Sequence, residues 1–314
     1  MGKQTSLAEK MRDRINKKFG SNAVKTFGED DPLLQVKNWI ELPEFFKLAS
    51  GGQGFPCGHL TQLIGEPDSG KTTLLMKGLV ECQKAGGVTY LVDNENKFDM
   101  KRFALMGGVP DQLEVFQGQV LGTDKEGNDI IKPLSLEDSW NFIEEVCKGV
   151  AELRSEGDTV PVMIGWDSIA AATPERIAAE KDSGDAHVAV EAKINNKNVR
   201  KIKHNLRQAD IALVTINHFY TTMPAPGKPP KDIIKGGEEL TFMSTLIVKT
   251  KKGAKLEREV LGEKQQIGRM TKYEIFKGHF HGRNLYKAVW VVDKGILESK
   301  EEYDEYKKTL KGKL

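Results

Sequence analysis

The sequence predicts an α/β fold in which helices flank a central sheet that is mostly parallel and finishes antiparallel. Apolar runs typical of buried strands alternate with helical patterns between Leu60 and Trp166, as in parallel strands joined by covering helices. Three later strand-like runs, at about 244–250, 272–276 and 286–292, have no helix between them. We therefore expect this end of the sheet to be antiparallel.

The chain begins with a segment that we expect to lie outside the core. Residues 6–9 (SLAE) resemble a capping box, and apolar residues then recur at helical spacing until Gly20. A short strand is expected over 23–27, before a polar breaker at 28–32. Residues 1–45 are therefore predicted to form an N-terminal helix and strand, whose apolar face needs a surface to dock on.

The core is expected to span residues 46–297, and a short helical tail residues 298–314. The polar cluster 122–129 is interpreted as a solvated loop or hairpin tip, and 174–185 as a polar stretch. The tail places acids first and lysines last, as a capped helix would.

The expected elements from 60 to 216 are strand 60–64, helix 72–84, strand 88–93, helix 99–106, strand 113–116, a helix from about 135, strand 160–166, a helix at about 189–208 and strand 211–216.

The composition is that of an ordinary soluble protein. The chain has 314 residues, enough for one large domain or two smaller ones, and 39% of them are hydrophobic and 29% charged. No apolar run approaches the roughly 20 residues that span a bilayer, and the polar start lacks a secretory signal. We expect no membrane partner and a cytoplasmic location, in the host if the protein is phage-encoded. Lys plus Arg (47) nearly equals Asp plus Glu (45), so a nucleic-acid partner must be argued from local patches.

The three cysteines are expected to be reduced structural thiols. Cys57, Cys82 and Cys147 fall in separate elements and lack the spacing of metal ligands. Neither a disulfide nor a zinc site is predicted.

A glycine-rich octet lies between the first core strand and the first core helix. It reads Gly65-Glu66-Pro67-Asp68-Ser69-Gly70-Lys71-Thr72 and satisfies the P-loop pattern. Glycines at both ends let backbone N–H groups approach a triphosphate, and the helix dipole favours anionic oxygens there. Lys71 would reach the terminal phosphates and Thr72 would bind magnesium. The alternative, a glycine-rich turn that matches by chance, does not explain the strand before it and the helix after it.

Basic residues follow one face of the helix at about 189–208, which places Lys193, Lys197, Arg200 and Arg207 together and Val199, Ile202 and Leu206 opposite. A solvated helix face is the ordinary explanation of such a stripe. However, the Pro/Gly-rich loop 219–237 is also basic, and it directly follows a sheet strand. Loops of this length within a compact domain tend to be functional or disordered.

In this order, the motifs resemble those of the RecA family of DNA recombinases, particularly its small phage members of the UvsX type, over nearly the whole chain. Residues 7–30 resemble the family's N-terminal helix and strand, which dock on a neighbouring protomer. Val92-Asp93-Asn94-Glu95 resembles the end of its second strand, and Val162–Glu175 (VMIGWDSIAAATPE) resembles Walker B and the approach to the first DNA-binding loop. Thr215-Ile216-Asn217-His218 resembles the sensor motif, before a loop that closes on Gly236-Gly237 like the second DNA-binding loop.

The resemblance implies a site for ATP and Mg²⁺ in a RecA-like P-loop core. Catalytic roles fall to Glu95, which would polarise the attacking water, to Lys71, and to His218, which would sense the γ-phosphate. Thr72 and, through water, Asp167 would hold the metal. Nucleotide contacts are expected from Gly65, Glu66, Pro67, Asp68, Ser69, Gly70, Lys71, Thr72, Thr73 and Arg102, the last at the position of an adenine-stacking aromatic. Taken singly, Glu95 could be a surface acid and His218 a satisfied core histidine.

The resemblance also implies contacts with a neighbouring protomer and with DNA. Lys277 and His279 occupy the place of a lysine pair that reaches the neighbour's ATP, with His279 replacing the second lysine. DNA contacts are expected from the first loop (about 176–190), the second loop (about 219–237) and the basic helix, through Arg176, Lys193, Arg200, Lys228, Lys231, Lys235, Gly236 and Gly237. The second loop has no aromatic near its middle, which leaves Met223, Phe219 and Tyr220 as candidate wedges. The bacterial C-terminal domain is expected to be absent.

These expectations combine into a DNA-dependent ATPase, an ATP hydrolase that forms filaments on single-stranded DNA. It would catalyse homologous pairing and strand exchange in recombination and repair. Its expected partners are single-stranded DNA, homologous duplex DNA, further copies of the chain, and mediator and single-strand-binding proteins. Two alternatives stay open: a ring-forming helicase motor that shares this core, and a nucleotide-gated DNA scaffold or recombination mediator with little ATP turnover.

Overall fold

The computed structural model describes residues 6–20, 23–24, 36–179, 186–221, 230, 232–260, 262–279 and 286–311. The chain divides into two units, Met1–Lys37 and Asn38–Leu314. The first contains helix α1 (Leu7–Phe19), and Ser6 and Glu9 form the predicted capping box at its start. The strand expected over 23–27 lies outside the described residues, except for Ala23 and Val24.

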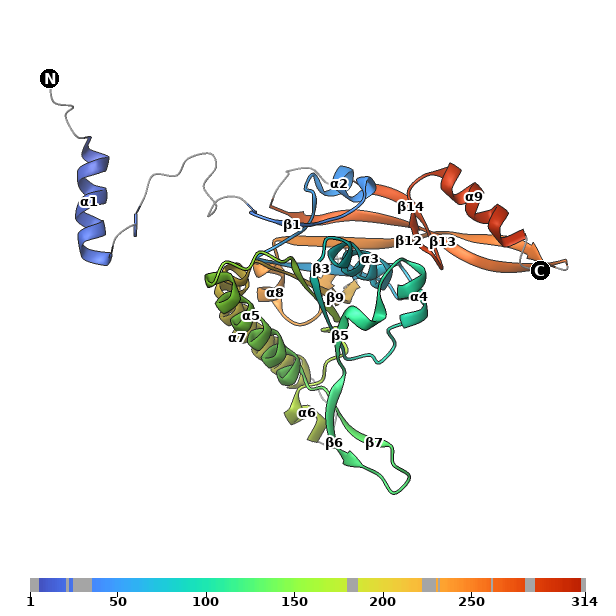
Figure 1. The fold of residues 1–314 in the computed structure, drawn as a ribbon, viewed down its shortest axis with the longest axis horizontal. Coiled ribbons are helices and arrows are strands. Elements are labelled where there is room, and N and C mark those ends of the chain that lie inside the picture. Colours follow the sequence, from blue (N-terminus) through green and yellow to red (C-terminus); the bar gives the residue numbers. More distant parts are fainter. Residues whose placement is uncertain are drawn as a thin grey trace. The chain divides into compact units, whose positions relative to one another are not determined.

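The second unit is built on a nine-stranded sheet of order β15-β14-β13-β12-β3-β9-β8-β4-β5 (Figure 1). Neighbouring strands from β12 to β5 are parallel, whereas β12 to β15 pair antiparallel. The predicted fold class is thus confirmed. The strands are β3 (His59–Gly65), β4 (Val88–Asp93), β5 (Leu113–Phe116), β8 (Val162–Asp167), β9 (Ile211–Asn217), β12 (Leu246–Val260), β13 (Glu263–Gly278), β14 (Tyr286–Val292) and β15 (Gly295–Leu297).

Helices cover both faces of this sheet. On one face, α2 (Glu44–Ser50), α3 (Lys71–Lys84) and α4 (Met100–Leu105) bury apolar side chains in a first cluster. On the other face, α5 (Leu136–Ser155) and α7 (Ala186–Ala209) lie side by side over a second cluster (Figure 1). The remaining helices are α6 (Glu175–Ala179), α8 (Glu238–Met243), α9 (Lys300–Lys311) and the 3-10 turn Pro110–Gln112.

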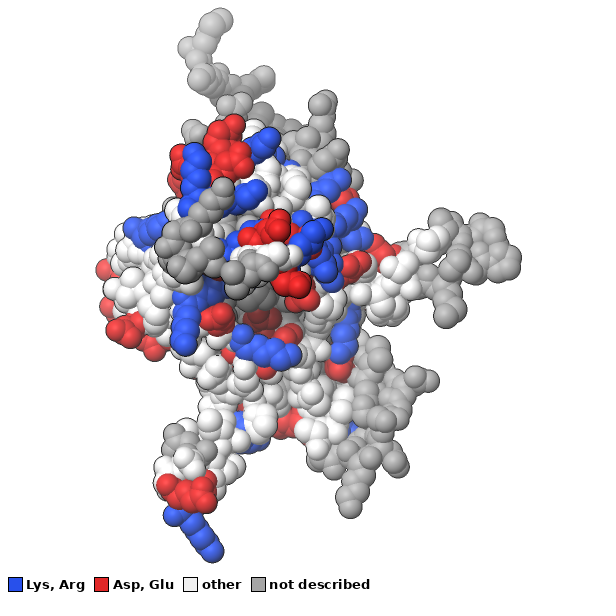
Figure 2. Space-filling view, turned by 90° about the vertical axis from the view of Figure 1, so that its right-hand side faces the viewer, with Lys and Arg blue, Asp and Glu red and all other residues white. Residues whose placement is uncertain are grey.

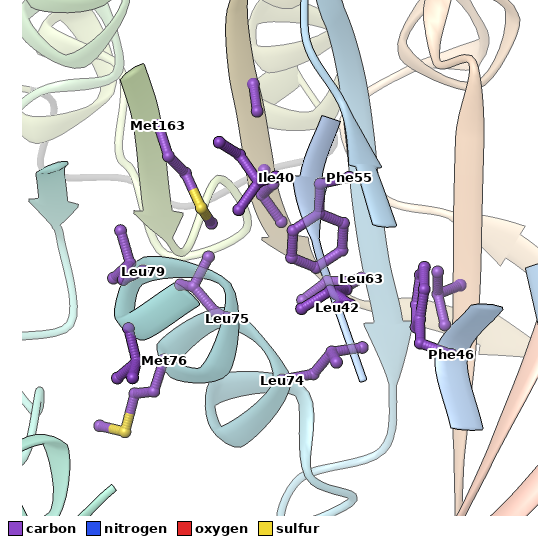
Figure 3. Packing of buried hydrophobic residues seen from close by; sticks show 14 of the residues in the cluster. Ile40, Leu42, Phe46, Phe55, Leu63, Leu74, Leu75, Met76, Leu79 and Met163 are labelled. Atoms are coloured by element: carbon purple, nitrogen blue, oxygen red, sulfur yellow. The ribbon is translucent and has the colours of Figure 1, made fainter. Parts of the chain in front are cut away.

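Helix α3, which follows the P-loop, is held by this packing. Figure 3 shows Leu74, Leu75 and Leu79 facing Leu63 of β3 and Met163 of β8, and all five side chains are buried. Each such leucine contributes on the order of 2 kcal/mol of burial free energy. The start of α3, and with it Lys71, is therefore set rigidly against the sheet.

The core unit begins earlier than the sequence indicated. Strand β1 (Trp39–Glu41) pairs with β2 (Gly54–Pro56), and Ile40, Leu42 and Phe45 are buried in the first cluster. The predicted boundary at residue 45 therefore falls inside α2. Strands of three residues carry too little periodicity to be recognised in a sequence.

Strands β12 and β13 extend far beyond the runs expected at 244–250 and 272–276. Strand β12 pairs with β3 only as far as Thr250 and continues beyond it with β13, whose residues 268–272 also pair with β14. We call these paired extensions, residues 251–260 and 263–272, the β12–β13 ribbon. The C-terminal helix α9 packs beside it, with Tyr306 against Leu256 and Val292. Figure 2, which faces this end of the molecule, shows basic and acidic side chains interspersed. Because these strand extensions are exposed and charged, their sequence lacks the apolar alternation by which a half-buried strand is recognised.

Two hairpins and one short helix complete the unit. Strands β6 (Gly118–Thr123) and β7 (Asp129–Pro133) form a hairpin, so the polar cluster 122–129 is indeed its tip. Strands β10 (Phe219–Thr221) and β11 (Asp232–Ile234) pair at the base of the second loop. The region expected to be the first loop contains α6 and the first turn of α7, and residues 180–185 between them lie outside the described residues.

In the described part of the chain, the three cysteines are free and buried. Burial raises the pKa of Cys82 and of Cys147 to about 12, so these thiols stay protonated at neutral pH. None of the described helices has the length and apolar character needed to cross a membrane.

Candidate active site

The P-loop joins β3 to α3 at the carboxyl edge of the parallel strands. Gly70 precedes α3 with φ +91°, a left-handed conformation that favours glycine, and its carbonyl accepts a hydrogen bond from Tyr273 Oη at 3.2 Å. The Lys71 side chain folds back over the loop, and its ammonium group donates to the carbonyls of Gly65 (2.9 Å) and Glu66 (2.8 Å). Burial lowers the pKa of Lys71, although Asp167 and Glu95 oppose the shift. The loop thus presents backbone N–H groups and a cation at a helix start.

Thr72 of α3 and Asp167 at the end of β8, the two residues predicted to hold the metal, are hydrogen-bonded to each other. Thr72 Oγ1 donates to Asp167 Oδ2 at 2.9 Å, and Asp167 ends β8 next to β4. Only 8% of Asp167 is exposed, and burial raises its pKa to about 6, with Glu95 and Asp93 adding to the shift and Thr72 opposing it. A divalent cation at this pair would favour the ionised carboxylate.

Glu95 lies beside this pair, held by residues that the sequence did not single out. Ser168 Oγ donates to Glu95 Oε1 at 2.8 Å, and Lys97 Nζ lies 3.9 Å from Glu95 Oε2. The buried Asp93 carboxylate accepts the backbone N–H groups of Glu95 (3.2 Å) and Asn96 (2.8 Å), which shapes the turn after β4. Ser168 directly follows the Walker B aspartate, Asp167. Its place at the end of a predicted strand could therefore have identified it as a candidate site residue from the sequence.

His218 lies at the end of β9, next to the P-loop strand. Burial lowers its pKa, and the Lys71 charge adds to the shift, so the ring is neutral at pH 7. Its carbonyl accepts the Lys235 backbone N–H at 2.9 Å. The same residue therefore adjoins both the candidate phosphate site and the end of the second loop.

A hollow of about 580 Å³ opens beside the P-loop. One side consists of P-loop residues with Thr73 and Arg102, which are all candidates for nucleotide contacts. The opposite side comes from the β12–β13 ribbon and β14, through Lys255, Gln266, Arg269 and Asp293. No motif in the sequence pointed to these residues, because they reach the hollow only through the fold.

The residues of this hollow fit ATP with Mg²⁺. Two buried polar atoms that line it, Arg102 Nε and Thr271 Oγ1, have no hydrogen-bond partner within the described chain. Arg102 Nη2 donates to the Val292 carbonyl at 2.9 Å, which holds the guanidinium at the wall. The described residues contain no group of three or more His, Cys, Asp or Glu that could hold a metal. Mg²⁺ needs no such group, because it binds through one or two protein ligands together with substrate phosphates and water.

The basic stripe of α7 is exposed, as expected, while Val199, Ile202 and Leu206 are buried. Arg200 is not a free cation: its guanidinium pairs with both carboxylate oxygens of Glu239, at 2.9 and 2.8 Å. This pairing raises the pKa of Arg200 and reduces the charge that it offers to a phosphate. Lys193 is exposed on α7 and Arg176 on α6.

The second loop is described only at its base. Met223, Lys228 and Lys231 lie outside the described residues, whereas Lys235 turns inward and donates to the Ala170 carbonyl at 2.9 Å. Gly236 and Gly237 both have positive φ and lie against α7. Phe219 packs under Lys249, whose Nζ lies 4.4 Å from the ring centroid, while Tyr220 is 54% exposed. Tyr220 is thus the more accessible of the two aromatic candidates for a wedge.

Lys277 and His279 lie at the end of β13, away from the hollow's lining. Lys277 Nζ donates to the carbonyls of Thr241 and Phe242, both at 2.8 Å, at the C-terminal end of α8. The His279 backbone N–H donates to the Thr245 carbonyl at 3.2 Å. Within one chain, then, Lys277 is engaged with α8, and contact with a neighbour's nucleotide stays a prediction.

The P-loop, the Thr72–Asp167 pair and Glu95 define a P-loop nucleotide-binding protein with an α/β core. The family model of the RecA N-terminal domain matches residues 6–282, so the chain belongs to the RecA family. Similar curated proteins include Protein RecA of Francisella tularensis subsp. novicida (strain U112), subsp. holarctica (strain LVS) and subsp. tularensis (strain SCHU S4 / Schu 4). Each is 28% identical over 257 residues, which cover 82% of this chain and 64% of the relative. The predicted family resemblance is confirmed.

Proposed function

We propose that this protein is a DNA-dependent ATPase that assembles as a filament on single-stranded DNA and catalyses homologous pairing and strand exchange. The observation that carries the proposal is the arrangement around His218. Its strand β9 pairs with β3 up to Asn217 and Ile64, so His218 lies beside the start of the P-loop, and its carbonyl accepts the backbone N–H of Lys235 at the end of the second loop. A nucleotide at the P-loop and DNA at the second loop would therefore both affect the residues at the end of strand β9.

The proposed hydrolysis depends on positioning and charge. Lys71 would leave its two loop carbonyls for the terminal phosphates, and Thr72 and Asp167 would hold Mg²⁺, which neutralises charge on the phosphates. Glu95 would orient a water molecule and accept its proton as the oxygen bonds to the γ-phosphorus and the bond to ADP breaks. Ser168 keeps the Glu95 carboxylate in one orientation during this step.

Recognition of DNA would be independent of sequence. Lys193 of α7, Arg176 of α6 and the second-loop lysines Lys228, Lys231 and Lys235 would contact phosphates, joined by the backbone of Gly236 and Gly237. Lys235 would have to leave Ala170, and Arg200 would have to leave Glu239, before either could do so. We propose that DNA binding includes this exchange of partners.

Assembly would complete the nucleotide site. Lys277 and His279 of one protomer would approach the nucleotide of the next, with the N-terminal unit docked on a neighbour. Single-stranded DNA, homologous duplex DNA, and mediator and single-strand-binding proteins are the proposed partners. The proposed location is the cytoplasm.

The test of this function combines two measurements on one sample. We expect ATP hydrolysis with Mg²⁺ to rise when single-stranded DNA is added, and negative-stain images of the mixture to show helical filaments. A fluorescent strand-exchange assay should then show transfer between homologous strands only. Unchanged hydrolysis together with absent filaments would overturn the proposal. Closed rings with fork unwinding would indicate a helicase motor instead.

The substitution Lys71→Ala tests the P-loop. We expect ATP hydrolysis to fall by at least about 100-fold, because the cation that would neutralise the terminal phosphates is removed. Lys77→Ala is the matched control, since Lys77 lies on the same helix and pairs with Glu81 at 2.7 Å. Equal hydrolysis by Lys71→Ala and the control would show that this loop is not the site.

A further inference from the structure

A line of four side chains, three of them buried, connects the turn that carries Glu95 to the end of the second loop. It consists of Asn94, Trp166, Trp140 and Asn195, which we call the Asn–Trp line. Its members come from the turn after β4, from β8, from α5 and from α7, so four segments distant in sequence meet in it. Trp166, Trp140 and Asn195 are 0%, 1% and 2% exposed.

The first half of the line starts next to Glu95. The Asn94 backbone N–H donates to the Asp167 carbonyl at 2.9 Å, which ties the residue to the strand that bears the metal-site carboxylate. Asn94 Oδ1 accepts the Trp166 indole N–H at 2.6 Å, and its amide donates to the Leu134 carbonyl at 3.2 Å. The Asn94 side chain is thus oriented by partners on two sides.

The second half ends at the loop. Trp166 packs edge-on against Trp140, with ring centroids 4.9 Å apart and an interplanar angle of 90°. The Trp140 indole N–H donates to Asn195 Oδ1 at 2.9 Å, and Asn195 Nδ2 donates to the Gly236 carbonyl at 3.1 Å. Gly236 has φ +91°, and a Cβ there would lie 2.9 Å from Asn195 Nδ2, so the loop end and this amide are in close contact.

The physical reason for a coupling role is the cost of breaking the line. The two indole N–H groups and the Asn195 amide are buried and have no water to replace a lost partner, so each broken hydrogen bond leaves an unsatisfied polar group. The Trp166–Trp140 contact between them contributes through packing. One relative placement of the Glu95 turn and the loop end is therefore favoured over all others. A ligand that moves one end of the line must also break or shift the contacts at the other end. Binding at either end therefore affects binding at the other, and this coupling is reciprocal.

We propose that the Asn–Trp line couples the nucleotide site to the second loop, with its four members acting as positioning residues. The inference rests on the proposed function, since it assumes that ATP binds at the P-loop and DNA at the loop. It adds a second connection, at the Gly236 carbonyl, to the backbone hydrogen bond between Lys235 and His218. Neither end of the line touches the reacting atoms.

The substitution Asn195→Leu tests the proposal, because leucine has a similar size but makes neither hydrogen bond. The quantity to measure is the ratio of single-stranded DNA affinities with and without a slowly hydrolysed ATP analogue. We expect Asn195→Leu to lower this ratio by about threefold to tenfold, while nucleotide affinity without DNA stays near the wild-type value. Asn198→Leu is the matched control: Asn198 lies on the same helix, and among the described residues its side chain donates to the Ile194 carbonyl of that helix, at 3.0 Å.

A second variant keeps the test valid if Asn195→Leu does not fold. Asn195→Asp keeps the acceptor for Trp140 and loses only the donor to Gly236, so a lowered ratio in this variant also supports the proposal. Combining Asn195→Leu with Asn94→Ala should lower the ratio no further than either change alone, since both interrupt one line.

The outcomes separate the two hypotheses. If the wild-type protein binds DNA and its affinity responds to the ATP analogue, the proposed function stands. A ratio that is the same in Asn195→Leu, Asn195→Asp and wild type would then overturn the Asn–Trp line alone. If the ratio of affinities in the wild-type protein is one, ATP does not affect DNA binding. Both the coupling inference and the part of the proposed function that links ATP to DNA are then wrong.

Discussion

The position of the Glu95 carboxylate depends on two neighbours. Ser168 donates to Oε1 at 2.8 Å, and the Asp93 carboxylate shapes the turn by accepting the Glu95 backbone N–H. Asp93 and Ser168 are buried, so neither contact competes with bulk water. A carboxylate held in this way is suited to orient a water molecule without reorganising first.

The substitution Glu95→Gln keeps an acceptor for Ser168 and removes the base. We expect ATP hydrolysis to fall by about 100-fold or more while nucleotide binding stays within about threefold, because only the proton transfer is lost. Phosphate release and binding of a fluorescent ATP analogue would measure the two effects. Glu114→Gln, an exposed change on β5, is the control. A loss of less than about tenfold would contradict the catalytic role of Glu95.

At the scale of elements, strand β3 carries a functional feature at one end and a buried histidine at the other. Its carboxyl end leads into the P-loop, and His59 at its other end lies near Arg207 of α7 and next to Thr245, which follows α8. His59 Nδ1 is 2.9 Å from Thr245 Oγ1, and burial lowers the pKa of the ring from 6.5 to about 4, with Arg207 adding to the shift and Asp210 opposing it. The folded protein therefore favours the neutral ring at this position.

This pKa predicts a pH-dependent stability. The unfolded chain takes up a proton on His59 near pH 6.5, whereas the folded chain does so only near pH 4, so protonation favours unfolding. The free energy of unfolding should therefore fall as the pH decreases from about 6.5 to about 4, by at most about 3 kcal/mol from this group. In urea titrations, His59→Asn should show a smaller decrease than wild type and than the exposed control His204→Asn. Equal decreases in all three would contradict this account.

At the scale of the whole molecule, the candidate nucleotide site and the base of the second loop lie at the same end of the parallel strands. The P-loop, Glu95, Asp167 and His218 all follow the carboxyl ends of parallel strands, and the second loop follows β9 directly. In open α/β sheets, this edge is where ligands bind. The proposed DNA contacts extend from it along α6 and α7, on basic residues that the structure leaves exposed.

The double substitution Lys228→Ala plus Lys231→Ala tests the second loop as part of the DNA site. We expect weaker single-stranded DNA binding at every sequence, and a log–log salt slope that is shallower by about 1.4, since each lost phosphate contact removes about 0.7. Lys307→Ala plus Lys308→Ala on α9 makes the same change of charge elsewhere. A salt slope equal to that of the control would exclude the two loop lysines from the DNA site.

By itself, the sequence determined the P-loop, the parallel order of the sheet core and the strand-end positions of Glu95, Asp167 and His218. These features depend on local spacing, on glycine positions and on apolar periodicity, which are properties of neighbouring residues. The roles of the second-loop lysines and of Lys277 and His279 stay predictions. Only the tertiary structure decided the ribbon wall with Lys255 and Arg269, the partner of Arg200, the burial of Ile40, Leu42 and Phe45, and the Asn–Trp line. Each of these depends on contacts between segments far apart in the chain, and such contacts leave no periodic trace in the sequence.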